Sequence, residues 1–482
     1  MEPLRVEREV LGRLPLAEAV LLLLRQATTP EHSVDLFERF REHCYTRELT
    51  FDVFVALIRE ALLHHQGSGR QACEQARLND VLTVSNQSVY NKLAGVPIAL
   101  SEAFLIENTQ QLLPLLPTDR TANAPASLRQ FRILTVDGKV TKRIAKKLGI
   151  LRGLRGGALG GKALVCLDNN SGLVLALAGC ADGDANDCSL VPALVDRVKA
   201  IVAADEQCLS VGDAQFADLT QPRRFQELVP GGRSHFLVRY SAKTTFTADA
   251  SARPAEAEGR LTGTDSRGRQ WHQEWGRLGS EDNPKRLFVR RVTVERPGEK
   301  AVSVLTDLAD PQKFPAEDLL ECYLSRVQIE GVFQKITEVF SLKKLIASRP
   351  KGTVFQLSFC LLLYNLIQVV QAYVAEGHAL KPTDVSTEML FVDVQKQLSA
   401  LMEVVPQEDL TELIPTVPKP AEVRDRLRTL LGGLWKPIWR KTVNKKRRPH
   451  PNKARGKTHS SVQRLLQQKK TKKLTQANTS RP

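Results

Sequence analysis

The order of short apolar runs in the middle of the chain constrains the fold more than any other feature. Four of these runs are short, apolar and partly β-branched, which predicts strands. One longer segment with apolar residues three and four apart predicts a helix. Together they give the order strand, strand, strand, helix, strand, and therefore an α/β domain. The strands are expected at 132–136, 163–167, 173–178 and 209–211, and the helix at 187–203.

Two aspartates follow the first and the fourth of these predicted strands. Asp137 ends the run that begins at Phe131, and Asp213 ends the run that begins at Cys208. Carboxylates at these two strand ends, in this order of elements, are typical of a ribonuclease-H-like core. A single aspartate after a strand is usually a turn cap, so only the combination indicates a site.

A third carboxylate lies on a predicted helix far downstream. In a single helix over 323–335, Tyr323, Arg326 and Glu330 fall on one face, because they are spaced at i, i+3 and i+7. A surface face held together by a salt bridge is the alternative interpretation. The neighbouring face is apolar and can pack on a core, with Ile329, Val332, Phe333, Ile336 and Phe340.

Two strand-end aspartates and one helical glutamate suit metal-dependent phosphoryl transfer. Two divalent ions about 4 Å apart can activate an attacking oxygen and stabilise a leaving oxygen. Mg²⁺ prefers carboxylate oxygen and keeps several waters, so few ligands suffice, and Mn²⁺ can substitute. We expect Asp137 to bridge the two ions, with Asp213 on one and Glu330 on the other. Arg326 would hold a phosphate oxygen, and Tyr323 would orient a phosphate or pack on a sugar.

With these residues, the chain resembles the DDE transposases of bacterial insertion sequences, specifically the insertion-sequence-four group. The hallmark of that group is Tyr-(2)-Arg-(3)-Glu-(6)-Lys, and the sequence matches it at Tyr323, Arg326 and Glu330. Asp137, followed by glycine, and Asp213 match the other two carboxylates of the family. The resemblance runs from about residue 85 to residue 374. Glu330 lies 117 positions after Asp213, which leaves room for the β-rich insertion of this group.

The resemblance implies a cut-and-paste DNA transposase that works with two Mg²⁺ ions. Such an enzyme binds the terminal inverted repeats of its element and the target DNA, as a homodimer on DNA. It cleaves the element ends by hydrolysis and then joins the freed 3′-hydroxyl to the target. Two alternatives remain open: a ribonuclease-H-like nuclease without strand transfer, and a domesticated DNA-binding protein that has lost catalysis.

One position departs from the family signature. Thr337 stands where the family has lysine. Lys335 is a candidate phosphate-binding residue nearby, but it points about 140° away from Glu330 on an ideal helix. The missing cation could instead come from Lys343 or Lys344.

Two tryptophans in the expected insertion are further candidates for contacts with DNA. In the family, an aromatic residue of the inserted sheet stacks on a base that flips out of the duplex. Trp271 and Trp275 could provide such a stacking face. Simple packing within the insertion is the alternative.

The chain divides into six expected segments, two of which together form one core. The helical N-terminal part is interpreted as DNA-binding, and 83–93 could be the second helix of a helix-turn-helix or part of an ordinary bundle. A Gly/Lys/Arg-rich loop at 138–162 either contacts a phosphate backbone or is a surface loop. The expected parts are an N-terminal helical domain (1–115), the ribonuclease-H-like core (128–234 and 311–375), a β-rich insertion (235–310), a helical region (376–435) and a basic disordered tail (436–482).

Charge concentrates at the end of the chain. The 482 residues carry a formal net charge of +16, and the segment from Lys436 to Pro482 has sixteen Lys and Arg but no Asp or Glu. A basic tail predicts a polyanionic partner, most often nucleic acid, although a solubilising tail has the same composition. Because it has little apolar patterning, the tail is expected to be disordered unless bound.

Cysteine usage and hydropathy indicate the compartment. The eight cysteines form no Cys-x-x-Cys pair and no zinc-type cluster, which predicts reduced thiols in a reducing cytosol. The N-terminus has no apolar stretch of signal-peptide length, and polar residues interrupt the apolar segment 355–374. We therefore expect a soluble protein without a membrane partner, located in the bacterial cytoplasm and associated with the nucleoid.

Overall fold

The computed structural model describes residues 5–65, 67–117, 124–141, 158–255, 261–265, 267–295, 300–340, 342, 346–347, 349–405, 412–414, 417–441 and 460–479. Most of the basic loop expected at 138–162 lies outside these residues, and so do Lys343 and Lys344. Their expected phosphate contacts stay predictions.

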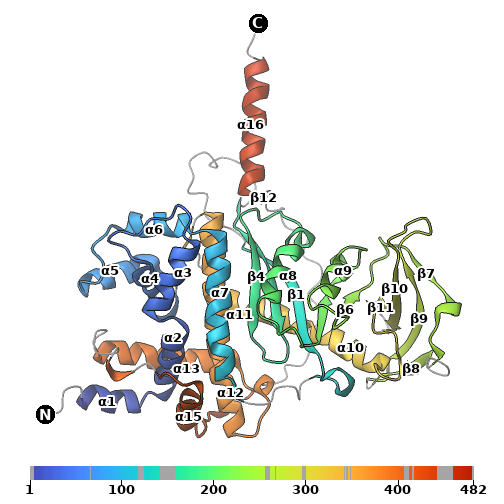
Figure 1. Cartoon of the computed structure of the whole chain (residues 1–482). Coiled ribbons are helices and arrows are strands. Elements are labelled where there is room, and N and C mark those ends of the chain that lie inside the picture. The colour runs from blue at the N-terminus through green and yellow to red at the C-terminus, as the bar shows by residue number, and fades with distance from the viewer. Residues whose placement is uncertain are drawn as a thin grey trace.

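Helices from both ends of the chain form one lobe, on the left in Figure 1. Phe355 of the long helix α12 lies 5.3 Å from Phe104 and 6.1 Å from Phe51, measured between ring centroids. These N-terminal and C-terminal helices share one apolar core, so they do not form separate cores. The lobe contains α1 (Arg5–Gly12), α2 (Pro15–Ala27), α3 (Pro30–Phe40), α4 (Phe51–Leu63), α5 (Gly69–Leu78), α6 (Asn86–Gly95), α7 (Ile98–Leu112), α12 (Pro350–Gly377), α13 (Thr387–Val404) and α15 (Pro420–Leu431).

Ser85 caps the N-terminus of α6. Its hydroxyl accepts a hydrogen bond from the Ser88 amide at 3.2 Å, which satisfies a free donor of the first turn. The outer face of α6 exposes Gln87, Ser88 and Asn91. The preceding α5 was not predicted, because Ala72 and Cys73 are its only buried residues. Two short helices joined by a turn are present, so the helix-turn-helix interpretation stays a prediction.

The central sheet has the expected order of elements. Its strands are arranged β4-β3-β1-β5-β6. The neighbours β1, β5 and β6 are parallel, whereas β3 pairs antiparallel with β1 on one side and with β4 on the other. The mixed sheet with N-terminal helices is the α/β architecture of a ribonuclease-H-like DDE domain. The bounds are β1 (Arg132–Val140), β3 (Lys162–Asp168), β4 (Val174–Cys180), α8 (Val191–Lys199), β5 (Cys208–Gly212), α9 (Gln221–Gln226) and β6 (Ser234–Arg239).

Both faces of this sheet are covered, which explains why its strands are continuously apolar. Val165 and Leu167 of β3 pack in the core that contains α12. Leu164 and Cys166, which point to the opposite face, pack in the core that contains α8.

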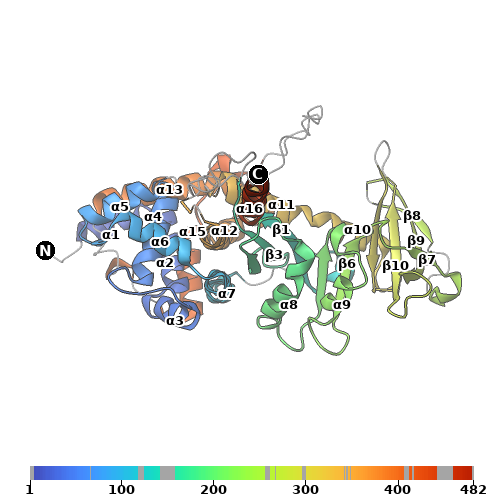
Figure 2. The same ribbon diagram turned by 90° about the horizontal axis from the view of Figure 1, so that it is seen from above.

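The β-rich insertion continues the central sheet. The segment 235–240 was expected to open the insertion, and this was wrong: β6 pairs in parallel with β5 and is the fifth strand of the core. β11 then pairs antiparallel with β6 and extends the same sheet. Figure 2 shows β6 between the core strand β1 and the inserted strand β10. An isolated strand pattern cannot reveal its neighbour, because pairing depends on contacts distant in sequence. The inserted strands are β7 (Phe246–Ala248), β8 (Thr262–Thr264), β9 (Gln270–Leu278), β10 (Leu287–Val294) and β11 (Val302–Thr306).

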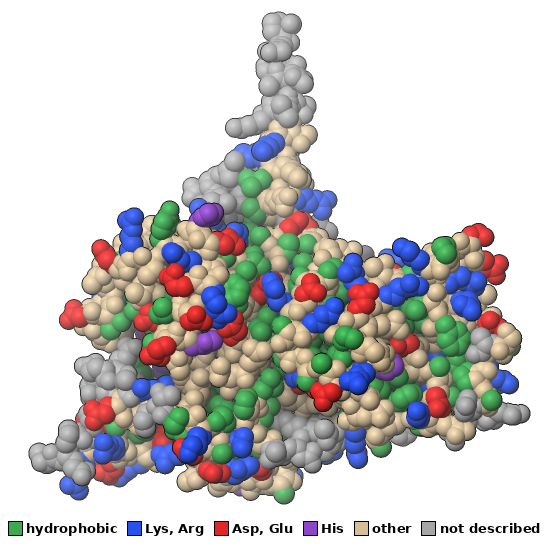
Figure 3. All heavy atoms as spheres, viewed as in Figure 1, with side chains coloured by type: hydrophobic (Ala, Val, Ile, Leu, Met, Phe, Trp, Pro, Cys, Tyr) green, Lys and Arg blue, Asp and Glu red, His purple; other side chains and the backbone are tan. Residues whose placement is uncertain are grey.

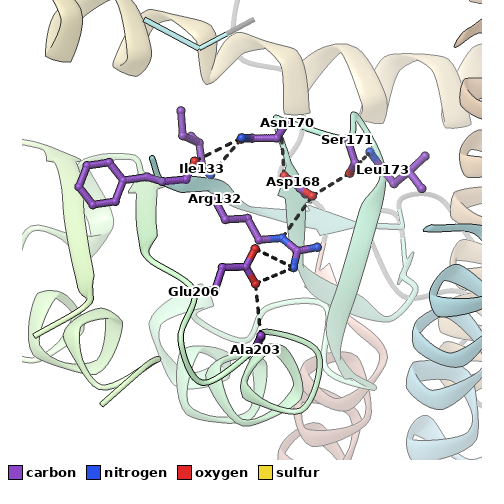
Figure 4. Close-up of polar contacts among 9 residues, drawn as sticks. Arg132, Ile133, Asp168, Asn170, Ser171, Leu173, Ala203 and Glu206 are labelled. Atoms are coloured by element: carbon purple, nitrogen blue, oxygen red, sulfur yellow. Dashed lines mark hydrogen bonds and ion pairs between the residues drawn. The ribbon is translucent and has the colours of Figure 1, made fainter. Parts of the chain in front are cut away.

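An ion-pair network fixes the first residue of β1 (Figure 4). The Arg132 guanidinium lies 3.3 Å from the Asp168 carboxylate and 3.1 Å from that of Glu206. The Asn170 side chain accepts from the Ile133 amide at 3.1 Å. These contacts tie the start of β1 to the end of β3 and to the segment before β5. The strand was expected to end before Asp137, and this was wrong: β1 continues to Val140, because Asp137 to Val140 pair with β3.

The expected helix over 323–335 is divided in two. α10 (Ala316–Ser325) ends where α11 (Val327–Glu338) begins, with Arg326 between them. The Arg326 backbone keeps helical angles, but the bonds on either side span three residues: Arg326 N to Tyr323 O and Ile329 N to Arg326 O, each 3.1 Å. This tighter turn breaks the regular helix while the chain continues in nearly the same direction.

The expectation of a disordered tail from Lys436 onward was wrong in two places. Trp439 is buried, and its indole donates to the Asp393 carboxylate at 2.8 Å, beside an ion pair between Lys436 and Asp393 at 3.0 Å. Later, β12 (Ser460–Ser461) pairs with β2 (Ala158–Leu159) and leads into α16 (Val462–Thr479), which projects from the body in Figure 1. The prediction from charge alone therefore failed for the buried Trp439 and for the helix α16.

One helix within the described residues, α12, is long and apolar enough to cross a membrane. All of its most apolar window is buried inside the protein, as is typical of a core helix. All eight cysteines are free thiols, and five of them are buried. In Figure 3, acidic and basic side chains are mixed over the visible face of the body, which fits a positive excess confined to the tail.

Candidate active site

Asp137 and Asp213 lie level with each other on neighbouring parallel strands. In the register of β1 and β5, Arg132 pairs with Cys208 and Thr135 with Val211, a constant offset of 76 residues. Asp137 and Asp213 are separated by the same offset and lie two residues beyond the last of these pairs. The spacing in the sequence therefore equals the register of the two strands, which places the two carboxylates side by side.

Arg326 connects the strand carboxylate to the helix carboxylate. One guanidinium nitrogen lies 3.2 Å from Asp137 Oδ2, and the other lies 2.8 Å from Glu330 Oε1. Burial opposes the charge of Arg326, but Tyr323 and the nearby carboxylates hold its pKa above the ordinary value. Tyr323 is buried beside it, and burial raises the pKa of its phenol. The structure thus brings together Asp137, Asp213, Tyr323, Arg326 and Glu330.

Asp137 carries an electrostatic penalty. Burial raises the pKa of its carboxyl to about 6, against the Gly138 amide and Arg326, which favour the charged form. The neighbouring Asp213 and Asp187 raise it further. The carboxylates of Asp137, Asp187 and Asp213 thus lie close to one another, and mutual repulsion in such a set favours a bound cation.

This crowding gives a prediction for the stability of the metal-free protein. Because the pKa of Asp137 is raised on folding, the folded state holds the proton more tightly, and stability is lost as pH rises from about 4 to about 6. A rise from 3.8 to about 6 corresponds to about 3 kcal/mol. Chemical denaturation would measure the free energy of unfolding of the wild type and of Asp137→Asn. Between pH about 4 and about 6, the stability of the variant relative to the wild type should rise by about 3 kcal/mol. A constant difference between the two proteins would contradict the raised pKa.

The donor set fits divalent metal ions, although Arg326 now stands between two of the carboxylates. Among the described residues, no three His, Cys, Asp or Glu side chains are placed to hold one ion together. Glu330 is 54% exposed and is held by Arg326. Asp137, Asp213 and Glu330 supply the carboxylate oxygens that Mg²⁺ prefers.

Asp187 is a residue of the site that sequence reasoning missed. It lies 2.5 Å from the Lys162 ammonium and accepts from the Gln215 amide at 2.8 Å. Its carboxylate also packs directly on Gly138. Asp187 therefore links β3, the residue after Asp137 and the turn after Asp213. It had no sequence signal of its own, because it was assigned only as the start of a helix.

The close contact at Gly138 gives a second prediction. A Cβ there would collide with the Asp187 carboxylate, so Gly138→Ala should cost about 1–3 kcal/mol of stability. Gly331→Ala is the matched control on α11, because nothing lies within 4 Å of its Cβ position. Thermal unfolding would be compared for both variants. Equal behaviour of the two would show that the contact is unimportant.

Three other candidates from the sequence do not join this cluster. Trp271 and Trp275 are 6% and 2% exposed, and Trp275 donates to the Ala309 carbonyl at 3.0 Å. Packing, the alternative interpretation, is what the structure shows for both. Lys335 lies over the Tyr364 ring of α12 at 5.5 Å, and burial lowers its pKa to about 8. It points away from Glu330, so the structure does not support it as a phosphate ligand.

The fold and the cluster of acids and one arginine define a phosphoryl-transfer type of domain. Residues 152–366 match the family model described as the transposase DDE domain. The match covers less than half of the chain and contains Asp213, Tyr323, Arg326 and Glu330, but it begins after Asp137. No curated protein matches the chain. A transposase DDE domain implies transposase function, phosphoryl transfer and DNA binding.

Proposed function

We propose that this protein is a cut-and-paste DNA transposase of the insertion-sequence-four group. The observation that carries the proposal is the level pair Asp137 and Asp213, joined through Arg326 to Glu330. The enzyme would bind the terminal inverted repeats of its element as a homodimer, in the bacterial cytoplasm. It would hydrolyse the element ends and transfer the 3′-hydroxyl to target DNA.

Asp137, Asp213 and Glu330 would hold two Mg²⁺ ions. When bound, the ions supply an activated attacking oxygen and a stabilised leaving oxygen. Asp137 is mostly ionised at neutral pH, because burial raises its pKa only to about 6. Arg326 would move from its carboxylate contacts to a phosphate oxygen, which its planar fork fits. Asp187 would keep the two strand ends in register by its contacts with Lys162 and Gln215.

The parts outside the core would supply DNA contacts. The polar face of α6 has side chains that can reach base edges, as in a helix-turn-helix. The basic tail would bind phosphates without reading sequence, so its contribution should weaken steeply as salt rises. A salt series on cognate and random duplexes, with the chain intact and truncated at Lys441, would measure this contribution.

The test of the proposed function uses DNA that flanks the gene. Inverted repeats on both sides would provide the element ends, and duplexes carrying them would be incubated with the protein and Mg²⁺. Cleavage followed by joining of a pre-cleaved end to a target plasmid is the expected result. Cleavage without joining would make the protein a nuclease, and DNA binding without cleavage would make it a non-catalytic binding protein.

A further inference from the structure

Lys139 lies on the same face of β1 as Asp137. The two residues are separated by one position in a regular strand, so their side chains point to the same side, about 7 Å apart along the strand. Both reach the helical segment that carries Glu330. Asp137 contacts Arg326 at 3.2 Å, and the Lys139 ammonium donates to Thr337 Oγ1 at 2.9 Å.

Thr337 receives this ammonium with a defined geometry. Its hydroxyl donates to the Phe333 carbonyl at 2.6 Å, which leaves its oxygen lone pairs to accept from Lys139. Lys139 Nζ also lies 3.4 Å from the Phe333 carbonyl oxygen and 5.4 Å from the centre of the Phe333 ring. These three contacts are with neutral groups, and they fix the position of the ammonium.

Thr337 and Glu330 are on the same face of α11. A separation of seven residues turns the helix to within about 20° of the starting direction, two turns further along. Glu330 is therefore flanked by a guanidinium, Arg326, on one side and by the Lys139 ammonium on the other. Two cations on either side of a carboxylate cluster suit a polyanionic strand that crosses it.

We propose that Lys139 binds a phosphate oxygen of the DNA strand being cut, and that Thr337 positions its ammonium. The proposal rests on the proposed function. In the family signature this cation is a lysine on the helix, at the position of Thr337. The proposal assigns the cation to a strand instead, in place of the earlier candidates Lys335, Lys343 and Lys344. A lysine at position 337 would bring its own ammonium to the same place, because the Thr337 hydroxyl already contacts the Lys139 ammonium.

The experiment exchanges the cation between strand and helix. Cleavage of a duplex carrying the terminal repeat would be measured for Lys139→Ala, Thr337→Lys, the double variant and Lys199→Ala, an exposed control on α8. Lys139→Ala should be at least about tenfold slower, because a charge-assisted phosphate contact is lost. The double variant should recover most of that loss. Thr337→Lys alone should be slower than wild type, because two ammonium groups then compete for one place.

Duplex binding provides a readout that does not depend on cleavage. Lys139→Ala should lower the slope of log affinity against log salt by about one for a random duplex, and Lys199→Ala should not change it. Thermal unfolding would show that each variant is folded. Wild-type rates and slope in folded Lys139→Ala, or a double variant no faster than Lys139→Ala, would overturn the inference. If the wild type binds but does not cleave, the proposed function fails, and the salt slope still decides the role of Lys139.

Discussion

Asp137→Asn, Asp213→Asn and Glu330→Gln are each expected to abolish Mg²⁺-dependent cleavage while leaving DNA binding largely intact. The two aspartates lie level on parallel strands, and Glu330 is connected to them through Arg326. Each amide removes one negative oxygen that a divalent ion needs, with little change in shape. A loss of at least about a thousandfold is reasonable for a group that stabilises charge in the transition state.

The control for these variants is affinity for a cognate duplex, measured with Ca²⁺ in place of Mg²⁺. Binding within a few-fold of wild type would show that the fold is intact. A variant that keeps near-wild-type cleavage would exclude that residue as a metal ligand. Asp137→Asn has a further signature, since it should be more stable than the wild type near pH 7 in the absence of metal, where the raised pKa of Asp137 is a cost.

Arg326→Ala is expected to slow cleavage at least about tenfold, the second largest effect. Two different nitrogens of this guanidinium contact Asp137 and Glu330, and a charge-assisted contact of this kind is worth about 1.5–3 kcal/mol. Without this guanidinium, the negative charges of Asp137 and Glu330 lose their cationic partner until a metal ion binds. Arg326→Lys should recover only part of the rate, because an ammonium cannot span both positions.

Lys335→Ala is the matched control for this prediction. It lies on the same helix, but its ammonium is directed toward Tyr364 of α12 and away from the carboxylates. Cleavage rates and Mg²⁺ dependence would be measured for the alanine variants at both positions, with thermal unfolding to correct for lost packing. Equal rate losses would contradict the assignment of the two helix faces.

Local patterns in the sequence predict the secondary-structure elements and the types of residue in the candidate site. Short apolar, partly β-branched runs predicted the first four strands of the core, and helical spacing predicted that Tyr323, Arg326 and Glu330 lie together. The offset between Asp137 and Asp213 was visible in the sequence, although only the β1–β5 register gives it a meaning. Strand composition and helical spacing depend on residues that are close in sequence, so they can be predicted without knowledge of the fold.

Only the tertiary structure decided which distant segments meet. It made β6 the fifth strand of the core, buried Trp271, Trp275 and Trp439, and placed Asp187 on Gly138. It also brought the Lys139 ammonium from β1 to Thr337 on α11. The physical reason is that strand pairing, burial and ion pairing depend on side chains that lie tens to hundreds of residues apart, and no local pattern records those partners.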